Sequence, residues 1–177
     1  LGAIGRETQK ICAAIGMRTA GYDPFLTSVQ VEGMGAEYYS DYRELMRDCD
    51  VVSIHVPLTE QTRNMITGRE LGLMKSTALL INCSRGGIID EADLAEALNA
   101  GVIAGAGLDV FGEEPPKADS SILRAKNIIV SPHSAAQTRE AVIHMAQMCV
   151  KGCLAVLNGE KWPYVADSKV YEHEKWR

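Results

Sequence analysis

The chain has 177 residues, of which 46% are hydrophobic and 23% are charged, and its formal net charge at pH 7 is −5. These values are typical of a globular domain with enough apolar residues to bury a core. Binding to nucleic acid or to an anionic membrane needs clustered Lys and Arg, so the acidic balance argues against both kinds of partner. No apolar run reaches the roughly 20 residues that a membrane-spanning helix needs.

Short β-branched or apolar runs alternate along the chain with segments of helical periodicity. The predicted helices cover residues 3–15, 42–47, 69–74, 91–99 and 138–157. The predicted strands cover residues 18–22, 36–39, 51–56, 78–83, 104–110 and 127–131. Parallel strands need crossover connections, which are right-handed, so the alternation predicts an α/β fold: a doubly wound, Rossmann-like parallel sheet with helices on both faces. We expect one domain over residues 1–160, followed by an irregular C-terminal tail over residues 161–177.

The five cysteines are an odd number and form no Cys-x-x-Cys pair. Free thiols of this kind pack as small hydrophobes and suit a reducing compartment, and the N-terminal residues lack the pattern of a secretory signal, so we expect a cytoplasmic protein. Cys149 and Cys153 lie one helical turn apart with His144 upstream, but no fourth ligand stands at a usual zinc spacing. We therefore expect no metal site.

The first glycines, Gly2 and Gly5, stand where the predicted helix of residues 3–15 begins. Small residues let the backbone approach a pyrophosphate, and the free N–H groups of a helix start hold its negative charge. Only the second part of the Gly-x-Gly-x-x-Gly fingerprint is present, because its first glycine and the strand before it would lie upstream of residue 1. A glycine pair at a helix start is also ordinary turn chemistry.

Asp23 follows a predicted strand and stands 18 residues after Gly5. An acidic residue at a spacing of about 20 reaches the adenosine ribose hydroxyls of a dinucleotide and repels a 2′-phosphate. The pattern therefore favours NAD over NADP. The alternative interpretation is an Asp-Pro turn with Pro24.

Two further polar residues stand beyond predicted strands, at the edge where open α/β sheets bind ligands. Arg85 has a planar guanidinium that can grip a carboxylate through two hydrogen bonds, and it could equally form a surface ion pair. His133 lies between a predicted strand and the long helix of residues 138–157. With a carboxylate partner it would be a general acid and base, and without one it would be structural.

Three ordered motifs give the sequence a more specific resemblance. They run from Asn82 to Asp90, from Leu108 to Pro115, and over Ser131-Pro132-His133. In order and spacing they resemble the D-isomer-specific 2-hydroxyacid dehydrogenase family, nearest to its phosphoglycerate dehydrogenase branch, and the resemblance covers residues 1–160.

The resemblance implies a catalytic set. In the family an Arg binds the substrate carboxylate and polarises the C2 carbonyl, a His exchanges the proton of the C2 hydroxyl, and a Glu partners the His. These roles fall on Arg85, His133 and Glu114, with Glu113 as the alternative partner. The chain departs from the family pattern directly after His133, where Ser134-Ala135-Ala136 replace an aliphatic residue followed by glycine.

The resemblance also implies NAD as the cofactor. Ala3 and Ile4 would meet the pyrophosphate, Asp23 the ribose, residues 56–57 the adenosine side, and residues 83–85 with Asp109 the nicotinamide carboxamide. The complete set of expected cofactor contacts is Gly2, Ala3, Ile4, Gly5, Asp23, Val56, Pro57, Cys83, Ser84, Arg85, Asp109, His133 and Ala136.

Finally, the resemblance implies a larger protein and its activity. Family members have a preceding half that builds much of a substrate domain and the first, central strand of the cofactor sheet, and the tail of residues 161–177 would return to that domain. The implied activity is hydride transfer between nicotinamide and C2 of a small D-2-hydroxy or 2-keto acid, by a homodimer. The alternative is a dinucleotide-sensing corepressor, since one corepressor family shares this fold and these motifs.

Overall fold

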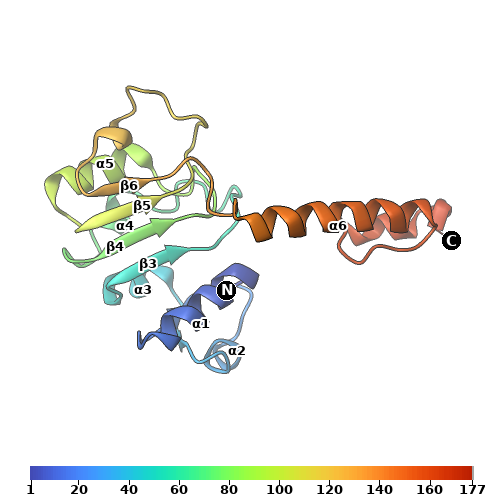
Figure 1. Cartoon of the computed structure of the whole chain (residues 1–177). Coiled ribbons are helices and arrows are strands. Elements are labelled where there is room, and N and C mark those ends of the chain that lie inside the picture. Colours follow the sequence, from blue (N-terminus) through green and yellow to red (C-terminus); the bar gives the residue numbers. More distant parts are fainter. Residues whose placement is uncertain (177) are drawn as a thin grey trace. The chain divides into compact units, whose positions relative to one another are not determined.

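The computed structural model describes residues 1–176, which form two compact units, one from Leu1 to His133 and one that starts at Ser134. In the first unit helices and strands alternate as the sequence predicts (Figure 1). Its helices are α1 (Ala3–Ala14), α2 (Ser28–Glu32), α3 (Tyr42–Asp48), α4 (Gly68–Leu71) and α5 (Glu91–Ala100), with a short 3-10 helix, η1 (Ser121–Arg124). Its strands are β1 (Ala20–Gly21), β2 (Glu37–Tyr38), β3 (Val51–Ile54), β4 (Leu79–Asn82), β5 (Gly105–Leu108) and β6 (Ile128–Val130).

All strand pairs in this unit are parallel, which confirms the predicted α/β class. Four strands form one sheet in the order β3-β4-β5-β6, and β1 and β2 form a separate pair. The register of the larger sheet places Leu80 opposite both Val52 and Ala106. Because the four strands are parallel and adjacent, the segments that follow them all leave from the same edge of the sheet.

The two sheets are separated by a groove of about 670 Å³ that is lined by residues of α1, β1 and β3. Both β1 and β3 are end strands of their sheets, so each has one strand neighbour within the described residues. Ile4, Ile11 and Ile15 on or beside α1 are 63–74% exposed. The family resemblance predicts a further, central strand at this position in the sheet.

The core lies between the four-stranded sheet and its helices. Strand β3 alternates exposed and buried residues, while Leu80, Leu94 and Leu98 are at most 2% exposed. Asp90 precedes helix α5 and caps it, because its side chain accepts hydrogen bonds from the backbone of residues 92 and 93. Gly101 follows the helix in the left-handed conformation that glycine favours.

Two features differ from the sequence-based expectation. Helix α2 was not predicted, because its five residues are too few to show a helical period. It is started by a capping box in which Thr27 and Gln30 exchange side-chain and backbone hydrogen bonds. The tail, expected to be irregular, contains the 3-10 helices η2 (Ser168–Glu172) and η3 (Glu174–Trp176).

The second unit is built on α6 (Arg139–Leu157), which the sequence predicts. Trp162 of the tail packs against α6 at Gly152, where an added Cβ would lie 3.2 Å from the indole nitrogen. Its carbonyl oxygen accepts the Tyr171 hydroxyl at 2.6 Å. With 19 residues and an 18-residue stretch of mean hydropathy 1.4, α6 is long and apolar enough, by length and composition alone, to cross a membrane. The expected absence of a membrane partner stays a prediction.

Candidate active site

The glycine turn opens α1, the helix that starts the first unit. Gly2 is the residue before the helix, no side chain caps it, and an added Cβ there would meet nothing within 4 Å. At Gly5 an added Cβ would lie 3.3 Å from Cβ of His55, so this glycine lets α1 approach the segment after β3. The turn thus offers uncapped N–H groups and open space, which suit the pyrophosphate of a dinucleotide.

Asp23, directly after β1, lies beside this turn. Its Oδ2 lies 2.5 Å from the backbone nitrogen of Leu1, and its Oδ1 accepts the Phe25 amide at 2.9 Å. The carboxylate therefore caps its own turn, as the Asp-Pro interpretation requires, and also lies at the glycine turn, as the cofactor interpretation requires.

The segments that follow β3 and β4 are joined to each other. The Ser84 hydroxyl donates to the carbonyl oxygen of Val56 at 2.5 Å, which links residues 56–57 to residues 83–85. His55, beside Val56, is half-buried, and burial lowers its pKa. The family resemblance predicts that both segments contact one cofactor, and in the structure they lie next to each other.

Arg85 is held in a turn built by Asn82, the last residue of β4. The buried Asn82 side chain accepts the Ser84 amide at 3.0 Å and donates to the Arg85 carbonyl at 2.9 Å. Arg85 is exposed; its Nη1 donates to the Ser84 carbonyl at 2.7 Å, and within residues 1–176 its guanidinium forms no ion pair. This finding does not support the surface ion-pair interpretation and leaves the guanidinium available for an anionic ligand.

Glycine at position 86 brings the Arg85 turn against the segment after β5. An added Cβ on Gly86 would lie 1.8 Å from the carbonyl oxygen of Phe111, a distance that no side chain tolerates. One residue further, the Gly112 amide donates to Oε1 of Glu91 at 2.5 Å. The backbone of the arginine turn is thus in direct contact with the segment that leads to Glu114.

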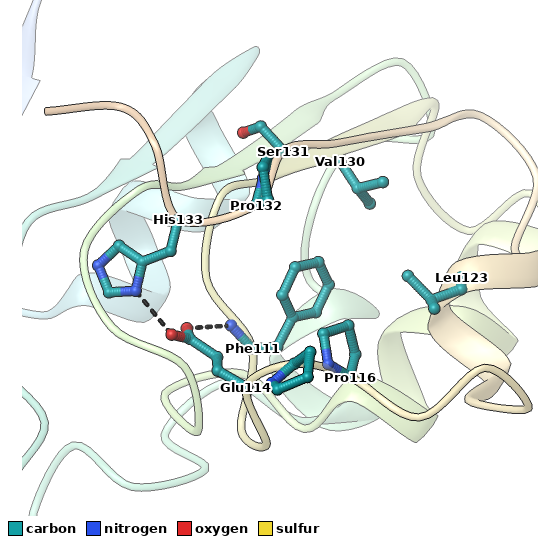
Figure 2. Close-up of a pocket in the computed structure, with 9 residues that line it drawn as sticks. Phe111, Glu114, Pro116, Leu123, Val130, Ser131, Pro132 and His133 are labelled. Carbon is teal, nitrogen blue, oxygen red and sulfur yellow. Dashed lines mark hydrogen bonds and ion pairs between the residues drawn. The ribbon is translucent and has the colours of Figure 1, made fainter. Parts of the chain in front are cut away.

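Glu114 and His133 form a hydrogen-bonded dyad, with 2.7 Å between Oε2 and Nδ1 (Figure 2). The other carboxylate oxygen accepts the Phe111 amide at 3.0 Å. The hydrogen bond from His133, and after it the one from Phe111, lowers the pKa of Glu114. Glu113, the alternative partner, instead pairs with Lys117 at 3.1 Å, so the structure favours Glu114.

The backbone of His133 is unusual for a residue with a side chain. Its φ is +52°, in the left-handed region. Its amide donates to the carbonyl oxygen of Asp109 at 2.8 Å. With Nδ1 directed to Glu114, the second ring nitrogen of His133 points away from Phe111 and Leu123 (Figure 2). A carboxylate on Nδ1 fixes the tautomer and leaves Nε2 to exchange a proton with a ligand.

Behind the dyad lies a largely apolar cavity of about 370 Å³. It is lined by Phe111, Glu114, Pro115, Pro116, Leu123, Val130, Ser131, Pro132 and His133 (Figure 2). Because Nε2 points away from this wall, the cavity is not the side on which a ligand would meet the imidazole.

The remaining expected contacts lie in different surroundings. Asp109 is 1% exposed, and its carboxylate accepts the Ser131 hydroxyl at 2.6 Å. Cys83 follows β4, and although the residue is exposed, partial burial of its thiol raises the pKa of that thiol. Ala136 belongs to the second unit. The expected cofactor contacts of these three residues stay predictions.

Sequence reasoning missed the residues that hold the site together. Asn82 and Ser131 stand inside the quoted motifs, yet no role was assigned to either. Asn at a strand end with Ser two residues later is the local signal of the Asn82 turn. The Ser131 contact joins two strands and has no local signal. Among residues 1–176, no group of three or more potential metal ligands comes together.

A comparison with protein families matches residues 1–135 to the D-isomer specific 2-hydroxyacid dehydrogenase, NAD binding domain. The chain belongs to this family. Its members bind NAD through this domain, so NAD is the cofactor, and the open glycine turn beside Asp23 fits a dinucleotide.

Relatives and solved structures agree with the family. Over 160 residues the chain is 44% identical to D-3-phosphoglycerate dehydrogenase of Methanocaldococcus jannaschii, covering 90% of this chain and 30% of that protein. Over 170 residues it is 39% identical to glyoxylate reductase of Aeropyrum pernix, covering 96% and 50% respectively. The D-lactate dehydrogenase of Lactobacillus jensenii, solved with NAD+, superposes with a TM-score of 0.84 at 33% identity, over 94% of this chain and 53% of that one. The chain therefore spans about half or less of these relatives.

Proposed function

We propose that this chain is the cofactor-binding part of an NAD-dependent dehydrogenase that acts on small D-2-hydroxy acids and their 2-keto counterparts. The observation that carries the proposal is the dyad of His133 and Glu114, at 2.7 Å, on the same sheet edge as Arg85. The named activities of the relatives, which are phosphoglycerate and lactate dehydrogenation and glyoxylate reduction, share a 2-hydroxy or 2-keto acid.

The side chains divide the reaction between them. The Arg85 guanidinium grips the substrate carboxylate through parallel hydrogen bonds and stabilises charge that grows on the C2 oxygen. His133 accepts the hydroxyl proton at Nε2 during oxidation and returns it during reduction. Glu114 stabilises the imidazolium that forms between these events. Bound NAD supplies the hydride chemistry at its nicotinamide ring.

The arrangement of strands explains how these roles converge. Arg85 follows β4, Asp109 follows β5 and His133 follows β6, and these strands are consecutive in a parallel sheet. In open α/β sheets, ligands bind beyond the carboxyl ends of the strands. The close packing of Gly86 on Phe111 ties the anion-binding turn to the dyad.

The test is NADH oxidation by the complete protein with a panel of 2-keto acids, comprising glyoxylate, hydroxypyruvate, phosphohydroxypyruvate and pyruvate. We expect turnover with at least one of them, and the panel also identifies the substrate. NADH binding without turnover on any 2-keto acid would contradict the proposal and favour the corepressor-like alternative. The homodimeric state and the cytoplasmic location stay proposals, which light scattering and cell fractionation would test.

A further inference from the structure

Ser131 connects the end of β6 to a buried carboxylate. Its hydroxyl donates to Oδ1 of Asp109 at 2.6 Å, and Asp109 is 1% exposed. The ladder between β5 and β6 also continues past both strands, because the Ser131 amide donates to the Leu108 carbonyl at 2.9 Å and the His133 amide donates to the Asp109 carbonyl at 2.8 Å. Asp109 is therefore the common partner of Ser131 and His133.

The backbone that these bonds hold is strained. A residue with a side chain rarely adopts the φ of +52° found at His133, and such a conformation persists only where its surroundings determine it. Pro132, the residue between, has no N–H group and cannot add a ladder bond of its own. In addition to the two ladder bonds, the hydrogen bond from the Ser131 hydroxyl to Asp109 holds the segment of residues 131–133 in place.

We propose that Ser131 is a positioning residue whose hydroxyl, through Asp109, holds His133 in the left-handed conformation that directs Nδ1 at Glu114. The kinetic part of this inference rests on the proposed function, whereas its structural part does not. Removal of the hydroxyl leaves both ladder bonds in place, so the fold persists while the turn relaxes. The imidazole then no longer stays within hydrogen-bonding distance of the carboxylate.

The charge state of Glu114 reports whether that happens. The hydrogen bond from His133 is the largest cause that lowers the pKa of Glu114, while the nearby charge of Asp109 raises it. When the imidazole moves away, the pKa of Glu114 therefore rises towards its ordinary value. A change that only destabilised the fold would lower the melting temperature and leave this titration unchanged.

The experiment compares Ser131→Ala, Ser131→Thr and Ser121→Ala in the complete protein. Ser121 is an exposed serine of η1 and serves as the matched control. The titration of the Glu114 carboxyl carbon is followed by ¹³C NMR, with Glu114→Gln for assignment, and kcat and KM for NADH are measured beside it. We expect Ser131→Ala to raise the midpoint and to lower kcat roughly 10- to 100-fold with KM for NADH unchanged. Ser131→Thr, which keeps the hydroxyl, restores both values.

The outcomes separate this inference from the proposed function. If Glu114 titrates at the same midpoint in Ser131→Ala as in the unaltered protein, the proposed role of Ser131 is wrong, regardless of the kcat of the variant. Failure of the unaltered protein to reduce any 2-keto acid would overturn the proposed function, and the NMR titration would still decide about Ser131. A raised midpoint in Ser121→Ala as well would mean that any nearby substitution disturbs the dyad, which also contradicts a specific role of Ser131.

Discussion

Glu114 is held by two donors at once, the imidazole of His133 and the backbone amide of Phe111. Both stabilise the charged carboxylate, and the His133 bond contributes most to its lowered pKa. Since this pKa lies below its unfolded value, the pair contributes stability above the unfolded pKa, and that contribution is lost as pH falls through the folded pKa. Activity that needs the charged carboxylate is lost over the same fall in pH.

Glu114→Gln should therefore lower kcat at least about tenfold, because a neutral amide does not stabilise the imidazolium. The acid limb of the pH–rate profile that Glu114 sets should also disappear. Steady-state kinetics of the complete protein across the acid range would measure both effects. Glu113→Gln is the matched control, since Glu113 pairs with Lys117 instead, and it should behave like the unaltered protein. A loss of kcat in Glu113→Gln with normal kcat in Glu114→Gln would instead make Glu113 the partner of His133.

At Asp23 the question is which cofactor the protein prefers. The carboxylate lies at the glycine turn, where it would pair with ribose hydroxyls and stand against a 2′-phosphate at like charge. Asp23→Ala should narrow the preference for NAD over NADP by about tenfold or more. Binding of both cofactors to the complete protein measures the ratio, with the exposed Asp119→Ala as the control. An unaltered protein that already prefers NADP would disprove this assignment.

At the scale of elements, the site depends on two segments packed backbone to backbone. No side chain fits at Gly86, because Cβ would lie 1.8 Å from the Phe111 carbonyl oxygen. Gly86→Ala should therefore destabilise the protein by about 1–3 kcal/mol and separate the Arg85 turn from the dyad. Gly68→Ala is the control, because its Cβ would be 3.5 Å from the nearest atom, an ordinary contact. Chemical denaturation measures the loss of stability, and kcat measures the effect on the site. Equal stability and equal kcat in Gly86→Ala and Gly68→Ala would contradict the proposed link between the Arg85 turn and the dyad.

The strands and the long helices could be predicted, because periodicity is a local property of a sequence. The spacing of the motifs also predicted the pairing of His133 with Glu114 that the structure shows, whereas the catalytic roles stay predictions. Helix α2 escaped prediction, since its capping box determines it and five residues carry no period. The contact of Gly86 with Phe111 and the hydrogen bond of Ser131 to Asp109 also escaped prediction. Each depends on the distance between segments that follow different strands, which only the folded sheet sets.

For the molecule as a whole, we expect the open groove between β1 and β3 to limit the activity of the chain alone. Two end strands line it, and strand edges without partners cost free energy that a marginally stable domain cannot easily absorb. We expect that residues 1–177 alone show no dehydrogenase turnover, and that the preceding half of the family chain, added as a separate polypeptide, restores some activity. A monomeric 177-residue chain that turns over unaided would contradict this account of the groove.

The most direct test of the whole account is the effect of His133→Asn on the complete protein. Asn keeps a polar side chain but cannot exchange a proton, so kcat should fall by about two to four powers of ten while the affinity for NADH stays the same. The exposed His144→Asn is the matched control and should change neither value. NADH binding by fluorescence, together with kcat on the best 2-keto acid, makes up the measurement. Loss of turnover with intact NADH binding is the result we expect, and near-normal turnover in His133→Asn would contradict the catalytic assignment.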